Sequence, residues 1–453
     1  VHKADLTGIE IINRLMEQVR ALDVEEMEEH RAIELIPARD GSGIAGVLFI
    51  DMRTGHYRMV QAKAVLLATG AGPTMYKYHT PSGDKTCDGL SMALRYGLKL
   101  RDMEMVQFHP TGLLGGPDTR MTGTVLEEGL RGAGGYLING NGERFMTHYD
   151  PRGERATRDV VSRGIYAEMR AGRTGPMGGI YIQMSHLGPE KVAKSFPGMV
   201  NRCKDCGFDL AGGRVEVVPT AHYLMGGVEF DIDCATASPG LFAAGEDCGG
   251  VHGANRLGGN GVANSTVFGG IAGETMAKYV STQTHWREPD QAVIAQGVSR
   301  AEYPFSQSAG PLHELRDRLA STMWDDVGVL RQQASMQRGL ATIQQHRQDL
   351  MQMGVVDGDR RYNVTWHDWL NLQSLVDISQ VITLSALARE NSRGAHYRED
   401  FPEPGDFESS CFTRVHGDVQ SLNLEMVPVS FDIVRPGESL LDESANPKVA
   451  QPA

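Results

Sequence analysis

A glycine-rich stretch at 252–261, HGANRLGGNG, holds the residues whose types and spacing are best suited to bind a ligand. Its four glycines allow backbone conformations that other residues avoid, so a ligand can approach the main chain closely. Arg256 places one fixed cation within the same stretch. The preceding run GLFAAGED at 240–247 is typical of a strand, so the glycines would form the loop at its end. The stretch therefore predicts a binding loop, although similar glycine spacing also occurs in plain turns.

Other stretches carry histidine, arginine or carboxylate side chains that could share a pocket with this loop: HPTG at 109–112, EEGLRG at 127–132, TRD at 157–159 and AHYLMGG at 221–227. Arg158 stands at the expected start of a helix, while Glu128 and Arg131 are three residues apart and so share one face of a helix or turn. In a pocket of low dielectric, repulsion between the arginines would ease proton transfer along Arg158, Glu128 and Arg131. The alternative is an ordinary salt-bridged helix start.

Two histidines, His109 and His222, each precede small or turn-forming residues. A single histidine is more often a surface or core residue than a ligand. Together with Arg256, however, the two would bind both ends of a four-carbon dicarboxylate by charge-assisted hydrogen bonds. Binding at both ends would orient the two central carbons for hydride movement. The constellation therefore predicts one pocket for a small dianion.

Composition excludes several classes of function. The chain has 453 residues, 41% hydrophobic and 22% charged, so we expect an ordinary soluble protein of two or three domains. The formal net charge of −13 disfavours a nucleic-acid partner. No apolar run reaches the roughly 18–20 residues that cross a bilayer. Any attachment to a membrane would therefore need another subunit. Six scattered cysteines fit a reducing compartment, and the CxxC of Cys203 and Cys206 lacks a second pair at zinc spacing, so we expect no metal site.

The apolar pattern predicts an α/β arrangement at the start of the chain. Apolar residues at helical spacing over 8–20 predict a helix that lies against a sheet or core. The continuous apolar run AVLLATGAG at 64–72 is typical of a buried parallel strand whose end approaches a cofactor. Further strands are expected at 32–36, 44–51 and 56–60, and a helix at 86–97.

The middle and end of the chain change in character. Glycine-rich turns, a short strand at 135–139 and a helix at 158–170 predict a separate lobe from about 115 to 218. The later elements that we expect are strands at 217–231 and 240–244, a small-residue helix at 262–280 suited to pack against a bound group, a polar linker at 282–310, helices beyond Pro311 including one at 368–390, and an extended end.

Six motifs follow one another along the chain: QFHPTG at 107–112, EEGLRGAGGYLIN at 127–139, ATRDVVSRGI at 156–165, PTAHYLMGGV at 219–228, GLFAAGE with HGANRLGGN within 240–260, and ENSRGAHYREDFP at 390–402. In this order they resemble the flavoprotein subunit of succinate dehydrogenase and fumarate reductase, over about residues 5–405. The resemblance implies an α/β fold in which a Rossmann-like FAD-binding domain is followed by an inserted α+β capping domain and a C-terminal helical domain. The implied boundaries are 1–114 and 219–281 for the FAD-binding domain, 115–218 for the capping domain, 282–310 for a linker, and 311–453 for the helical domain and tail.

The resemblance also implies an activity, the interconversion of succinate and fumarate by hydride transfer to or from FAD. Arg158 would transfer the proton, with Glu128 and Arg131 as its relay. The implied substrate ligands are His109, His222 and Arg256. The implied flavin contacts are Ala68, Thr69, Gly70, Asp88, Glu246, Arg256, Asn260, Gly261 and Val262. Electrons would pass to an iron–sulfur subunit, then to a membrane-anchored quinone site, which would place the chain as a peripheral subunit on the cytoplasmic side of the cell membrane.

The chain departs from the family pattern at three places. The family usually has threonine, a further substrate ligand, where this chain has Glu127, and often serine where it has Gly261. No GxGxxG dinucleotide fingerprint occurs near the start. In the family that segment lies N-terminal to the position where this chain begins, so we expect about a hundred residues or more to have been lost or to lie on another polypeptide.

Three other functions stay open at this point. An L-aspartate oxidase shares the dicarboxylate site but passes electrons to oxygen or fumarate, and a soluble fumarate reductase needs no membrane partner. The third is of another class: a flavin-free scaffold that docks an iron–sulfur subunit. The sequence does not determine the reaction direction or the oligomeric state.

Overall fold

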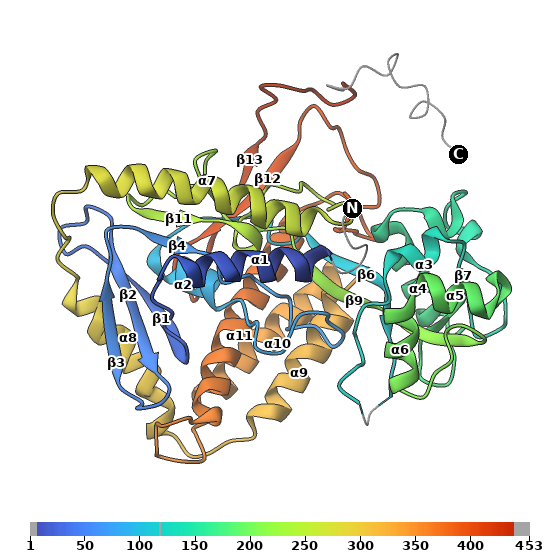
Figure 1. Cartoon of the computed structure of the whole chain (residues 1–453), viewed down its shortest axis with the longest axis horizontal. Helices are drawn as coiled ribbons and strands as arrows, with labels where there is room; N and C mark the ends of the chain where they lie inside the picture. The colour runs from blue at the N-terminus through green and yellow to red at the C-terminus, as the bar shows by residue number, and fades with distance from the viewer. Residues whose placement is uncertain (1–6, 117–118, 439–453) are drawn as a thin grey trace.

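The computed structural model describes residues 7–116 and 119–438. Two short strands lie side by side in the centre of the molecule (Figure 1): β4 (Val65–Leu67) and β11 (Leu241–Ala243). They pair in parallel, with Val65 opposite Leu241 and Leu67 opposite Ala243. Because parallel strands end at the same edge, the segments after Leu67 and Ala243 meet there, as the apolar runs predicted.

An antiparallel three-stranded sheet flanks this pair: β1 (His30–Pro37), β2 (Ile44–Asp51) and β3 (Tyr57–Gln61), in that order. Helix α2 (Asp88–Tyr96) packs against β1, and its residues 89–94 are buried. It begins at Asp88 because Cys87 has a left-handed backbone, with φ of +55°, which cannot continue a helix. These strands and this helix agree with the expected elements to within one or two residues.

The lobe expected at 115–218 is built on an antiparallel sheet in the order β6-β9-β8-β7: β6 (Val106–Leu113), β9 (Arg214–Leu224), β8 (Ile180–Gln183) and β7 (Tyr136–Ile138). Four helices cover it: α3 (Glu128–Gly132), α4 (Arg158–Arg170), α5 (Pro189–Ser195) and α6 (Pro197–Asp205). This part has its own core, which includes Leu130, Ile165 and Ile182, and it projects to one side of the molecule (Figure 1). Since β6 and β9 extend into the main body, they link the two cores.

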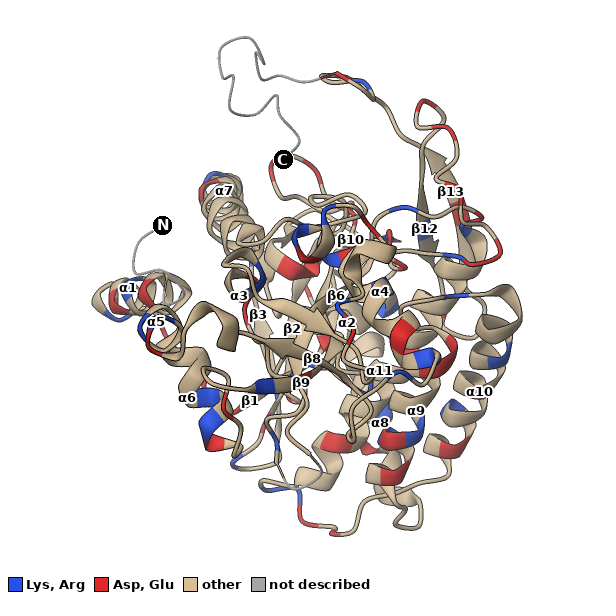
Figure 2. Ribbon diagram, turned by 90° about the vertical axis from the view of Figure 1, so that its right-hand side faces the viewer, with Lys and Arg blue, Asp and Glu red and all other residues tan. Residues whose placement is uncertain are grey.

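Three helices form the C-terminal bundle: α9 (Leu312–Asp326), α10 (Gln333–Met351) and α11 (Val364–Ala388). Figure 2 shows acidic and basic residues on α9 and α10, the outer helices of the bundle. Most of α11 is buried, with Trp366 and Trp369 fully inside. No helix within the described ranges has both the length and the apolar character needed to span a bilayer.

Helix α1 (Thr7–Ala21) has the expected bounds but not the expected burial. None of its residues is buried, and Ile9, Ile12 and Leu15 are 60%, 60% and 49% exposed. Instead of packing on a sheet, the helix lies across a cavity from α7 (Asn260–Thr282): Ile11, Ile12 and Leu15 line the cavity from α1, and Val262 and Ser265 line it from α7. Helix α7 is also largely exposed, with only Asn264 and Ala272 buried. Periodicity therefore predicted the helix correctly and its packing wrongly.

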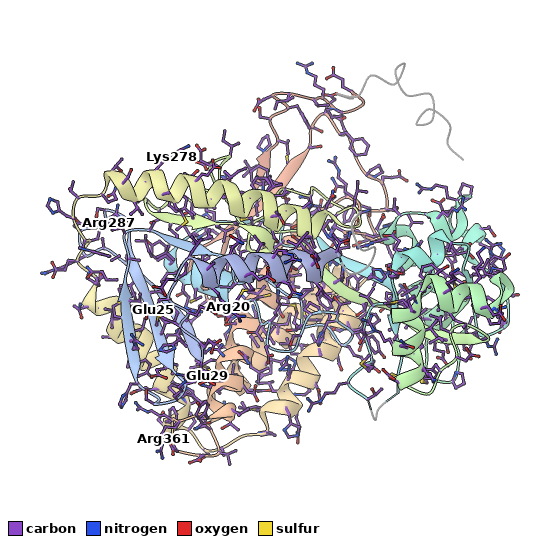
Figure 3. The ribbon with its side chains drawn as sticks, viewed as in Figure 1. Arg20, Glu25, Glu29, Lys278, Arg287 and Arg361 are labelled. Carbon is purple, nitrogen blue, oxygen red and sulfur yellow. The ribbon has the colours of Figure 1, made fainter. Side chains whose placement is uncertain are left out.

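The segment expected as a polar linker at 282–310 is folded. It contains α8 (Gln291–Glu302), whose side-chain cap is Asp290, and the indole of Trp366 donates to the carbonyl oxygen of Ala301 over 2.7 Å. Figure 3 labels Arg287 just beyond α7, where its guanidinium donates to the Tyr279 hydroxyl over 2.5 Å and to the Ile44 carbonyl over 3.3 Å. The linker prediction was wrong because polar side chains of this segment bind neighbouring segments through hydrogen bonds. The pattern of apolar residues gives no information on such bonds.

The chain after the helices is also more regular than expected. Strands β12 (Cys411–His416) and β13 (Asn423–Pro428) form a hairpin that joins β5 (Leu100–Arg101) and β10 (Gly227–Val228) in one sheet, with Val415 opposite Leu100. The C-terminal segment therefore returns to the main body. The extended end that we expected falls partly in 439–453, outside the described residues.

The cap of α8 gives a stability test of the corrected segment. Asp290 Oδ1 accepts from the amides of Ala292 (2.8 Å) and Val293 (3.4 Å), so Asp290→Ala should lower the free energy of unfolding by about 1 kcal/mol. Asp290→Asn keeps the capping oxygen and should lose only a fraction of that. Urea unfolding of the three proteins measures the difference, and an unchanged Asp290→Ala value would mean that the Asp290 cap adds nothing to the stability of the fold.

Candidate functional site

The ladder between β6 and β9 brings His109 and His222 together. His109 pairs with Thr220 in register, and irregularities on either side of it turn the strand locally. The two imidazole rings lie 5.5 Å apart, edge to face. Burial lowers the pKa of His222 to about 3 and the pKa of His109 well below its ordinary value, and nearby arginines lower both further. Both histidines are therefore neutral at pH 7, and the hydroxyl of Thr80 lies 2.8 Å from Nδ1 of His222.

Arg158, Glu128 and Arg131 form the continuous chain that the spacing predicted. Arg158 is the first residue of α4, and its Nε and Nη2 donate to Glu128 Oε2 over 3.0 and 2.9 Å. Glu128 begins α3 and accepts from Arg131 Nη2 over 3.3 Å through its other oxygen. Burial lowers the pKa of Arg131, and the repulsion of Arg158 lowers it further, while Glu128 opposes both effects. The geometry fits a proton path as well as a structural ion pair.

The glycine loop carries Arg256 into the same region. Its guanidinium lies 4.5 Å over the ring of Tyr223, and burial, followed by repulsion from Arg158, lowers its pKa to about 10. A Cβ on Gly258 would lie 3.0 Å from Glu128 Oε2 and 3.2 Å from Arg158 Nη2. The loop therefore packs directly against the Arg158–Glu128 pair, and a side chain at position 258 would push against both.

Gln107 connects the two arginines and was not predicted, although it begins the QFHPTG motif. Its side-chain oxygen accepts from Arg158 Nη1 over 3.2 Å, and its Nε2 donates to the carbonyl oxygen of Arg256 over 2.6 Å. Asn255 extends the network, accepting from Gln107 over 3.1 Å and donating to Asp159 over 2.9 Å. No spacing in the sequence marks Gln107; only the structure shows it as a buried amide in β6, and a buried amide must find polar partners.

A cavity of about 810 Å³ opens in front of these groups. Residues predicted as ligands or flavin contacts that line it are Ala68, Thr69, Gly70, Arg158, His222, Glu246, Arg256, Gly261 and Val262. Behind this lining, His109 contacts His222 while Glu128 and Arg131 continue from Arg158. The structure thus gathers the expected substrate groups at one wall of one cavity.

Besides His109, Glu128 and Arg131, three more predicted residues are absent from the lining of this cavity. Glu127 is the residue before α3, and its carboxyl group lies beside Gly129. Asp88 begins α2 and Asn260 begins α7, each at a helix start. The second acid of the EEG motif, Glu127, is therefore not among the residues that line the cavity.

The ends of β4 and β11 form a cradle suited to the flavin nucleotide. Gly70 and Gly245 have left-handed backbones, with φ of +70° and +76°, which bring main chain rather than side chains to the cavity. Burial raises the pKa of Glu246 to about 7, and this carboxyl group accepts from the Leu224 amide over 3.0 Å. Asp247 was not predicted, yet its buried carboxyl group accepts from the amide of Thr69 and from the amide of Gly70 over 3.1 Å. The residues present therefore fit the cofactor.

Comparisons with known families agree with this geometry. The family model described as FAD binding domain matches residues 1–262, and the one described as Fumarate reductase flavoprotein C-term matches residues 316–441. The cofactor predicted from the motifs, FAD, is thereby confirmed.

Individual proteins match over most of the chain. One of the subunits of the fumarate reductase (CoM/CoB) of Methanothermobacter marburgensis is 39% identical over 402 residues, which cover 89% of this chain and 72% of that protein. An L-aspartate oxidase of Synechocystis is 33% identical over 430 residues, covering 89% and 74%. A variant of quinol fumarate reductase from Escherichia coli superposes with a TM-score of 0.87 at 31% identity, over 95% of this chain and 76% of that one. The predicted FAD-binding, capping and C-terminal helical domains are confirmed by this match.

The neutral state of His222 has a consequence for stability. Its pKa is about 3 in the folded protein and about 6.5 in an unfolded chain, so between these values only the unfolded state binds the proton. As the pH falls through this window, His222 should lower the free energy of unfolding by up to about 1.4 kcal/mol per pH unit. His222→Asn removes this contribution, and urea unfolding at pH 6, 5 and 4 should give a correspondingly shallower slope. A slope identical to that of the wild type would mean that His222 is protonated in the folded protein.

Proposed function

Because the chain belongs to the family of fumarate reductase and succinate dehydrogenase flavoprotein subunits, we propose that it interconverts succinate and fumarate at the cavity between the glycine loop and the β6–β9 ladder. The observation that carries this proposal is the convergence of Arg158, Arg256 and His222 on one cavity beside the flavin cradle. Three segments far apart in sequence supply these groups.

Charge balance favours a dicarboxylate as the ligand. Arg131, Arg158 and Arg256 carry three positive charges, and Glu128, which bonds two of them, carries one negative charge. Within this cluster of four side chains the difference is two positive charges, which a bound dianion would neutralise. Burial makes this neutralisation worth more than it would be in water. The two neutral histidines add hydrogen-bond donors without adding charge.

Each group of the chain has a distinct task in this proposal. His109, His222 and Arg256 bind the carboxylates and orient the two central carbons. When bound, FAD supplies the hydride chemistry. Arg158 gives a proton to the neighbouring carbon in fumarate reduction and removes it in succinate oxidation. Glu128, which bonds both Arg158 and Arg131, returns the proton between turnovers.

Electron transfer requires a partner, and we propose an iron–sulfur subunit. The similar quinol fumarate reductase supports a membrane quinone as the further partner, so that this chain would be a peripheral subunit on the cytoplasmic side. The relative from Methanothermobacter marburgensis, with higher identity, is named for CoM and CoB and supports these two compounds as a second candidate source of electrons. The dicarboxylate site is the same in both cases.

Aspartate is the competing substrate, because an L-aspartate oxidase is 33% identical to this chain. Aspartate carries an ammonium group in addition to its two carboxylates. The charged groups that line the described part of the cavity are Arg158, Arg256, Lys85 and Glu246. Burial raises the pKa of Glu246 to about 7, so this carboxyl group is only partly ionised at pH 7 and offsets the repulsion between an ammonium group and the three cations incompletely. The cavity therefore favours succinate and fumarate.

The direct test is turnover of the FAD-loaded protein with a dye acceptor. Succinate should reduce the dye, and aspartate at the same concentration should reduce it at least about tenfold more slowly, since repulsion of one ammonium group costs on the order of 1.4 kcal/mol. Turnover of aspartate alone would reassign the chain as an oxidase of amino acids. A preparation that binds no flavin would instead favour a scaffold.

The proton role of Arg158 has its own test. Arg158→Gln keeps a hydrogen-bonding side chain but removes the transferable proton, so turnover should fall by roughly 10³-fold while FAD stays bound. The control is Arg170→Gln, at the other end of α4, where the arginine is half exposed and pairs with Glu399. The control should keep wild-type turnover. Activity retained in Arg158→Gln would assign the proton to another group.

A further inference from the structure

The loop that carries Arg256 is held from behind by a turn at 393–396, within the motif ENSRGAHYREDFP. The amide of Arg393 donates to the carbonyl oxygen of His396 over 2.8 Å, and the amide of His396 donates back to Arg393 over 3.0 Å. At the tip of the turn, the Ala395 amide donates to the carbonyl oxygen of Ala254 over 2.8 Å. The main chain two residues before Arg256 is therefore bonded to the C-terminal part of the protein.

Gly394 makes this contact possible. Its backbone is left-handed, with φ of +53°, and a Cβ there would lie 2.3 Å from the carbonyl oxygen of Ala254 and 2.6 Å from its carbonyl carbon. Such distances are far below van der Waals contact, and the obstacle is main chain rather than a flexible side chain. The two loops consequently meet with no room for a side chain at position 394.

The turn itself is fixed by a buried pair, Arg331 and His396, both with no exposed surface. Arg331 Nη1 donates to His396 Nδ1 over 2.7 Å and to the carbonyl oxygen of Glu104 over 2.8 Å. Burial, followed by the charge of Arg331, lowers the pKa of His396 well below its ordinary value, so the ring is neutral. Its Nε2 then donates to the carbonyl oxygen of Arg389 over 3.3 Å. The ring thus has a partner on both sides.

A second connection runs through α4. Arg163 Nη1 donates to the carbonyl oxygen of Gly394 over 2.9 Å, and the same guanidinium pairs with Asp159 at 3.1 Å. Asp159 in turn accepts from Asn255 over 2.9 Å. Arg163 therefore joins the turn to the residue that directly precedes Arg256, and it does so from the helix that begins with Arg158.

We propose that the turn at 393–396 is a positioning clamp that sets the location of Arg256 relative to Arg158. The clamp acts through Ala254 and Asn255 and touches neither substrate nor cofactor. It rests on the proposed function, since the importance of Arg256 follows from its role as a dicarboxylate ligand. Loss of the clamp should weaken dicarboxylate binding more than it slows the bound reaction.

The test uses the FAD-loaded protein and malonate, a dicarboxylate that cannot be oxidised in the same way. Gly394→Ala should raise the dissociation constant of malonate by about tenfold in calorimetry, and raise KM for succinate more than it lowers kcat. Amide hydrogen exchange over 252–261 should become faster, because the loop loses its support. The matched control is Gly405→Ala. Gly405 is also left-handed, with φ of +70°, but a Cβ there meets nothing closer than Asn391 at 3.5 Å. The control should keep wild-type affinity and exchange.

A second pair of variants applies if Gly394→Ala fails to fold. Arg163→Met removes the donor to Gly394 and should both weaken malonate binding and speed exchange over 252–261, whereas Arg163→Lys keeps a cation and should restore at least part of each. Wild-type affinity and exchange in Gly394→Ala or Arg163→Met would overturn the clamp, as would equal losses in Arg163→Met and Arg163→Lys. If the wild-type protein itself binds no malonate, the proposed function fails, and the exchange comparison alone decides the clamp.

Discussion

Three guanidinium groups around a single carboxylate are the constraint on which the site depends. Arg131, Arg158 and Arg256 are brought together by Glu128 and the glycine loop, and burial lowers the pKa of Arg131 and of Arg256. Arg158 also begins α4, where the helix dipole disfavours a cation. Repulsion between these cations lowers the stability of the fold unless an anion binds among them. The fold therefore maintains an unfavourable cluster, which the dicarboxylate of the proposed function would compensate.

The sequence predicted those parts of the site that depend only on the spacing of residues within one helix or strand. Glu128 and Arg131 lie on one face of α3, and Arg158 begins a helix with the expected bounds. The parallel pair of β4 and β11 was expected because continuous apolar runs favour buried parallel strands. The substrate ligands and the flavin contacts, by contrast, were assigned mainly through family resemblance, and their individual roles stay predictions.

The parts that the sequence did not predict depend on contacts between distant segments. Gln107 bonds residues on α4 and on the glycine loop, and Asp247 bonds the end of β4, yet neither spacing nor composition marks them. Helix α8 was missed although Asp290 stands at its start, because the polar sequence around it resembled a linker. For α1 the error was opposite, since an amphipathic pattern states which face is apolar but not what covers it.

The C-terminal part of the chain, as far as the structure describes it, supports the glycine loop, and in this way it affects the position of Arg256 without lining the cavity. Glycines give the loop close approach to the Arg158–Glu128 pair, but the same freedom deprives it of intrinsic rigidity. A binding group must be held within about 0.5 Å of its productive position. The missing rigidity must therefore come from outside the loop. Arg331, which follows α9, bonds His396 within the turn at 393–396, and the hairpin of β12 and β13, which joins the sheet of β5, anchors the chain after the turn. The turn, held in place by these contacts, fixes the position of Ala254 through the hydrogen bond from the Ala395 amide.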